Sequence, residues 1–77
     1  MPTVFQKEGF RFFFYSNDHS PVHIHVTHGD GEAVFNVDPA VELRESAGIK
    51  VRDLARAQEL AEENRQLIIS KWHEHLG

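Results

Sequence analysis

The fold is decided by the segment Val22-His23-Ile24-His25-Val26-Thr27-His28-Gly29-Asp30-Gly31-Glu32-Ala33-Val34-Phe35-Asn36-Val37. Apolar and polar residues alternate strictly through Val22–Thr27, and apolar residues recur at every second position through Ala33–Val37. This period of two is typical of β-strands that bury one face. Between the two runs, Gly29-Asp30-Gly31 is typical of a tight turn. The segment is therefore expected to form an antiparallel β-hairpin.

The facing of side chains in this hairpin does not depend on which residues form the turn. Either Gly29-Asp30 or Asp30-Gly31 can form it, and the two resulting registers differ by two residues. A slip of two residues keeps every side chain on its face, whereas a slip of one inverts the facing. In both registers His23 and His25 are therefore expected on the face opposite the apolar core.

The residues on either side of this hairpin predict further strands. Thr3–Lys7 and Phe10–Tyr15 are β-branched or aromatic runs separated by Glu8-Gly9, which predicts a second hairpin. After the central hairpin, Asp38-Pro39 ends the strand, and Val41–Arg44 can add one more. We expect an antiparallel β-meander of four or five strands from about residue 3 to residue 44.

The C-terminal part of the chain predicts one long helix. Val51–His75 lacks Gly and Pro and is rich in Ala, Leu, Glu, Arg and Gln, which favours about six or seven helical turns. One stripe recurs at helical spacing and comprises Leu54, Ala57, Ala61, Asn64, Ile68, Trp72 and His75. Packing this helix on one face of the sheet gives an α+β fold, with residues 1–77 as a single domain.

The composition excludes several classes of protein. The 77 residues contain no Cys, which excludes a disulfide scaffold, a thiolate nucleophile and Cys-ligated metal sites. No apolar run approaches the length of a membrane span and no signal-peptide pattern is present, so we expect a cytoplasmic protein without a membrane partner. Eight Lys and Arg against 12 Asp and Glu give a charge of −4, and nucleic acid is therefore not an expected partner.

The second face of the sheet carries the candidate partner-binding residues. If the even-numbered Phe residues of Phe10–Tyr15 join the core, Phe13 and Tyr15 lie with His23 and His25 on the opposite face. Such a face is more aromatic than ordinary exposed surface, and contiguous apolar patches usually mark contacts. We expect these four residues to bind a protein partner or a second copy of the chain.

The histidines allow an alternative interpretation. His23 and His25 are two residues apart on one strand, so their side chains point the same way about 6–7 Å apart, and either can serve in catalysis. They can act as general acid and base in ribonuclease-type phosphoryl transfer. With His19 as a third ligand, they can hold Zn²⁺ or another divalent metal, and Asp18 can orient a ring. The preferred interpretation, a protein-binding module, needs no cofactor. In the enzyme alternative, His19 or His73 acts together with His23 and His25 as the third participant.

The second histidine pair, His73 and His75, does not predict a metal site. On a helix, residues two apart point about 200° apart, so the two rings cannot converge on one ion. We expect His73 to be solvated and His75 to be partly buried beside Trp72.

Several motifs together resemble a bacterial family of small proteins catalogued as domain of unknown function 4160. These motifs are Phe10–His19, Pro21, His23, His25-Val26, Gly29–Ala33, Asn64 and Trp72–His75. The family brings no established activity. Its members resemble components of two-gene toxin–antitoxin modules, often beside the family called domain of unknown function 2442, which implies a protein partner encoded nearby.

The expected function is a non-enzymatic protein-binding module, one half of a bacterial toxin–antitoxin pair. The acidic charge favours a neutralising role, because toxins that cleave RNA tend to be basic. The alternative is a His-dependent ribonuclease or a metal-assisted hydrolase that uses the cluster His19, His23 and His25.

Overall fold

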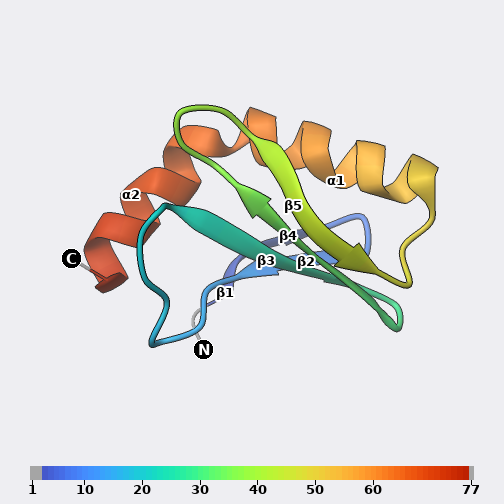
Figure 1. Cartoon of the computed structure of the whole chain (residues 1–77), viewed down its shortest axis with the longest axis horizontal. Coiled ribbons are helices and arrows are strands. Elements are labelled where there is room, and N and C mark those ends of the chain that lie inside the picture. Colours follow the sequence, from blue (N-terminus) through green and yellow to red (C-terminus); the bar gives the residue numbers. More distant parts are fainter. Residues whose placement is uncertain (1–2, 77) are drawn as a thin grey trace.

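The computed structural model describes residues 3–76, and within them five strands form one sheet, followed by two helices (Figure 1). All neighbouring strands are antiparallel and follow one another in chain order, so the sheet is a simple meander. The elements are β1 (Thr3–Lys7), β2 (Phe10–Phe13), β3 (His23–His28), β4 (Gly31–Asn36), β5 (Glu42–Ala47), α1 (Val51–Glu63) and α2 (Arg65–Leu76). The predicted α+β fold and the five-stranded form of the meander are confirmed.

The central hairpin adopts the first of the two expected registers. Gly29-Asp30 forms the turn, and Ile24 of β3 lies opposite Phe35 of β4. The left-handed backbone of Gly29, at φ 58°, suits a residue without Cβ at this turn. As expected, the side chains of Ile24, Val26, Ala33 and Phe35 share one face of the sheet.

Both helices pack on that face and leave the other face of the sheet uncovered. A single core cluster joins the sheet to the helices, and its buried members are Phe10, Phe12, Phe14, Ile24, Val26, Ala33, Phe35, Val37, Val41, Ala57, Leu60, Ala61, Ile68 and Trp72. Because side chains of the sheet and of both helices belong to one cluster, the helices and the sheet are expected to unfold together.

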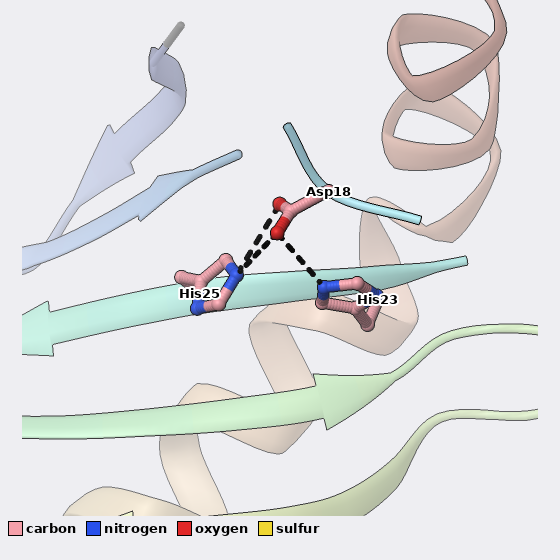
Figure 2. Close-up of side chains that lie close together, drawn as sticks. All are labelled: Asp18, His23 and His25. Carbon is pink, nitrogen blue, oxygen red and sulfur yellow. Dashed lines mark hydrogen bonds and ion pairs between the residues drawn. The ribbon is translucent and has the colours of Figure 1, made fainter. Parts of the chain in front are cut away.

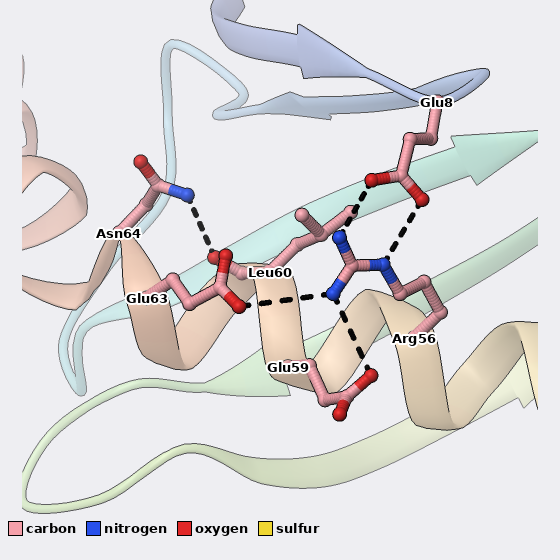
Figure 3. Close-up of polar contacts among 6 residues, drawn as sticks. All are labelled: Glu8, Arg56, Glu59, Leu60, Glu63 and Asn64. Carbon is pink, nitrogen blue, oxygen red and sulfur yellow. Dashed lines mark hydrogen bonds and ion pairs between the residues drawn. The ribbon is translucent and has the colours of Figure 1, made fainter.

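The prediction of one long helix is wrong, because the helix is interrupted at Asn64. The backbone of Asn64 leaves helical geometry (φ −109°, ψ 17°). Its backbone N–H donates to the carbonyl of Leu60 at 3.1 Å. Its side-chain amide donates to the same carbonyl at 2.9 Å (Figure 3). Asn disfavours helix interiors because its side chain competes for nearby backbone groups. The next residue, Arg65, donates to the carbonyl of Val37 (2.8 Å) and to Asp38 (2.9 Å), which fixes α2 against the β4–β5 connection.

The last strand is longer than predicted and contains an irregularity. β5 runs from Glu42 to Ala47, three residues beyond the predicted end at Arg44. Val34 lies opposite Glu45 and Phe35 lies opposite Leu43, which leaves Arg44 as an extra residue, a β-bulge. Because of the bulge, Leu43 lies on the same face of the sheet as its partner Phe35, and Glu45 lies on the opposite face with its partner Val34. All six residues of this edge strand are exposed.

Two long-range contacts fasten the N-terminal hairpin and the end of β5. The guanidinium of Arg56 in α1 donates to both carboxylate oxygens of Glu8 in the β1–β2 turn, at 2.9 and 2.6 Å (Figure 3). Gly31 at the start of β4 lies so close to Gly48 that a Cβ at position 31 would meet the Gly48 carbonyl oxygen.

Within residues 3–76, no helix is long and apolar enough to cross a membrane.

Candidate functional site

The uncovered face of the sheet carries the predicted cluster of aromatic and histidine side chains. The rings of Phe13 and His25 stack at 5.6 Å, and Tyr15 meets them edge-on at 5.3 and 4.5 Å. These residues come together because Phe13 of β2 lies directly opposite His25 of β3. The guanidinium of Arg11 lies 4.8 Å from the centre of the Phe13 ring, a cation–π contact. The predicted facing of Phe13, Tyr15 and His25 therefore agrees with the structure.

This cluster is more closed than the sequence suggests. Phe13 is only 3% exposed and His23 only 6%, whereas Tyr15 is 43% exposed. Phe13 is covered by its neighbours on the same face. His23 begins β3 beside α2, and its ring meets that of Trp72 at 5.1 Å. Of the four residues expected to bind a partner, Tyr15 therefore offers the most accessible surface.

Asp18, His23 and His25 bring their polar atoms together at one end of this face (Figure 2). Nε2 of His23 lies 3.3 Å from Oδ1 of Asp18, and Nε2 of His25 lies 3.3 Å from both carboxylate oxygens. The two imidazole rings are 5.1 Å apart. The histidines come from alternate positions of β3, and the carboxylate comes from the loop before it.

A hydrogen bond to the backbone sets the proton position on His23. Its Nδ1 lies 2.8 Å from the carbonyl oxygen of Pro21, which can only accept, so Nδ1 carries a hydrogen. In the neutral ring, Nε2 is then the atom with the lone pair, and this atom faces Asp18.

The loop holds Asp18 in its ionised form. Burial by itself would raise the pKa of Asp18, but the N–H of Tyr15 donates to Oδ2 at 2.8 Å, and His25 and His23 add a hydrogen bond and positive charge. Together these interactions outweigh burial and lower the pKa of Asp18 below its ordinary value of 3.8. The site therefore presents one carboxylate and two imidazoles.

The other candidate histidines lie outside this cluster. His19 is exposed and lines a shallow pocket of about 370 Å³ beside the cluster, but the three residues that converge include Asp18 in its place. His73 is exposed on α2, as predicted. His75 is also exposed, so its predicted partial burial is wrong; Leu76, one turn after Trp72, packs against the core instead.

His28 has a role that the sequence did not indicate. Its ring stacks on Phe10 at 4.1 Å, and its Nδ1 lies 3.1 Å from the carbonyl of Gly9. Its Nε2 lies 3.7 Å from Asp53 near the start of α1. His28 continues the core-facing positions of β3, so the period of two places it away from His23 and His25.

An open pocket of about 350 Å³ lies on the uncovered face of the sheet. Tyr15, His25 and Val34 contribute aromatic and aliphatic surface to it, and Glu32 and Glu45 contribute two exposed carboxylates. The pocket therefore combines stacking surface with negative charge, which suits a cationic or aromatic group.

A family model described as "Domain of unknown function (DUF4160)" matches residues 9–73. The match includes Asp18, His23 and His25, and it extends from the β1–β2 turn into α2. Comparison with curated proteins found no match. Comparison with solved structures also found none.

Proposed function

The chain belongs to the DUF4160 family, whose description names no activity, and from the geometry of the uncovered sheet face we propose that it is a non-enzymatic protein-binding module. The observation that carries this proposal is the open pocket over β2–β5, on the face of the sheet that the helices leave free. Protein partners commonly anchor one aromatic or Arg side chain in such a pocket.

The chemistry of the pocket favours a basic segment of the partner. Glu32 and Glu45 line it together with the exposed ring of Tyr15. A guanidinium can pair with these carboxylates and stack on the aromatic ring in the same pose. The net charge of −4 would also accelerate association with a basic partner.

The exposed edge strand β5 offers a second element of recognition. All its residues are exposed, and Glu45 belongs both to this strand and to the pocket. An extended segment can pair with a free sheet edge through main-chain hydrogen bonds while a side chain enters a neighbouring pocket. In this proposal the partner is the product of a neighbouring gene, in a bacterial cytoplasmic toxin–antitoxin pair in which this acidic chain neutralises a basic protein.

Co-expression with the product of the neighbouring gene tests this proposal. We expect the two proteins to co-purify, and Glu45→Lys to weaken the complex at least tenfold while leaving the fold intact. Glu62→Lys is the matched control, because Glu62 is an equally charged exposed residue on α1, on the opposite side of the sheet. The proposal fails if no complex forms and co-expression leaves growth unchanged. Sedimentation of the isolated chain identifies the other outcome, a homodimer.

A His-dependent ribonuclease or hydrolase is the second candidate, favoured by the meeting of two imidazoles and a carboxylate. Arg44 lines the shallow pocket beside His25 and can contact a phosphate. Incubation of the protein with RNA, with and without EDTA, tests this function. Cleavage lost in His25→Ala but retained in His73→Ala supports it, since His73 lies on α2 away from the cluster. Absence of cleavage in the parent protein rejects ribonuclease activity.

A further inference from the structure

The Asp18 carboxylate is positioned independently of the histidines. The N–H of Tyr15 donates to Oδ2 of Asp18, and the N–H of Asp18 donates to the carbonyl of Tyr15 at 3.2 Å. These reciprocal bonds close the turn from Tyr15 to Asp18 and aim the carboxylate at β3. His23 and His25 lie on a central strand of the sheet, so all three side chains are held by ordered backbone.

The distances within the cluster match the spacing of ligands around a metal better than a direct ion pair. Charge-assisted N–H···O bonds are usually about 2.7–2.9 Å long. The Nε2 atoms of His23 and His25 both lie 3.3 Å from Asp18 oxygens. With metal–ligand bonds of about 2.0–2.2 Å, two ligand atoms in tetrahedral zinc sites are about 3.3–3.6 Å apart. All three donor atoms lie within 4.8 Å of one another, so the two imidazole nitrogens move closer together when both bind one ion.

The surroundings of His23 resemble those of a metal-ligating imidazole. Such rings typically donate their second N–H to a carbonyl or carboxylate, which orients the ring and directs the other nitrogen at the ion. Nδ1 of His23 donates to Pro21 in this way. Its Nε2 lone pair then faces an acceptor-only carboxylate, an arrangement that an intervening cation satisfies.

We infer that Asp18, His23 and His25 form a site for a divalent first-row transition-metal ion of the Zn²⁺ class, with at least one coordination position open to solvent. Two imidazoles and one carboxylate suit such ions, whereas Mg²⁺ and Ca²⁺ prefer oxygen ligands alone. The open position faces the shallow pocket lined by His19 and Arg44. This inference does not rest on the protein-binding proposal, and either can fail without the other.

Titration of the untagged, EDTA-treated and desalted protein with Zn²⁺ tests the site. By calorimetry we expect one ion to bind per chain. Free Zn²⁺ at about 100 times Kd should raise Tm by roughly 10–20 °C, because the ion binds the folded chain alone. Asp18→Asn and His25→Gln should each weaken binding at least tenfold. Using two variants keeps the test decisive if one of them fails to fold, which circular dichroism of the metal-free protein reveals.

His73→Gln is the matched control, since it removes an exposed imidazole from α2 and should leave both Kd and the Tm shift unchanged. His19→Gln should also leave Kd within about twofold, because His19 is not among the converging donors. No uptake of Zn²⁺ by the parent overturns the inference and leaves the cluster as direct polar contacts between Asp18 and the two rings. Binding that survives in both Asp18→Asn and His25→Gln, or is lost in His19→Gln alone, also overturns it.

Discussion

Ile24 lies at the centre of the face of β3 that packs against the helices, and truncating it to Ala tests the facing from which the site was built. Its side chain is fully buried, opposite Phe35 and within the single core cluster. The substitution removes three carbon atoms, worth about 2.4 kcal/mol at about 0.8 kcal/mol per buried carbon. The residual cavity adds to this loss, and such truncations usually cost about 2–5 kcal/mol in total. We expect Ile24→Ala to lower the free energy of unfolding by about 3 kcal/mol.

This loss is large for so short a chain. A domain of this length is stable by only about 4–12 kcal/mol, so the substitution removes a quarter or more of the total. Thermal unfolding followed by circular dichroism should show Tm lowered by roughly 12–24 °C, if each kcal/mol accompanies about 4–8 °C. Ile24→Val, which removes one carbon, should cost about 0.5–1.5 kcal/mol.

Val51→Ala is the control for this prediction, because Val51 is also a β-branched residue but is 83% exposed. Surface substitutions of this kind usually change stability by less than about 0.5 kcal/mol. If Ile24→Ala cost no more than Val51→Ala, the assigned facing of β3 would be refuted, and with it the placement of His23 and His25 on the uncovered face.

Three further predictions concern long-range contacts. Gly31→Ala should lower Tm and the yield of folded protein, because its Cβ would meet the backbone carbonyl of Gly48, which cannot move aside as a side chain can. The hydrogen bond from Arg56 and its charge lower the pKa of Glu8 below its ordinary value of 4.5. The pair therefore stabilises the fold above about pH 4.5, and this contribution is lost as pH falls through the lowered pKa of Glu8. In urea unfolding, Glu8→Gln should therefore lose less stability on acidification than the parent protein. Arg65→Gln should cost about 1–3 kcal/mol in the same assay, because acceptors in the β4–β5 connection lose their donor.

The periodicity of the chain determined the facing of its strands without reference to the rest of the structure. Alternation at period two placed His23 and His25 together, away from Ile24 and Val26, and the outcome was the same for either turn. Facing is a local property, because it follows from the geometry of an extended backbone. The same reasoning placed Phe13 beside His25, as the structure shows.

The sequence left open whatever depended on contacts between distant segments. The helix is interrupted at Asn64, and next to this break Arg65 donates to the carbonyl of Val37, a long-range contact that helix propensity does not contain. Exposure on the uncovered face likewise depended on neighbours: α2 covers His23, so only part of the aromatic patch remains accessible.

The candidate site itself divides in the same way. Its two histidines were paired by the strand period. The alternative interpretation named His19 or His73 as a third participant and Asp18 as a residue that orients a ring; the structure brings Asp18, rather than its neighbour His19, to the pair. These two residues are adjacent in a loop, where no period relates chain position to direction. The turn between Tyr15 and Asp18 decides which of them points at β3. A strand repeats its geometry and can be predicted residue by residue, whereas a loop takes its direction from the particular hydrogen bonds that the folded chain allows.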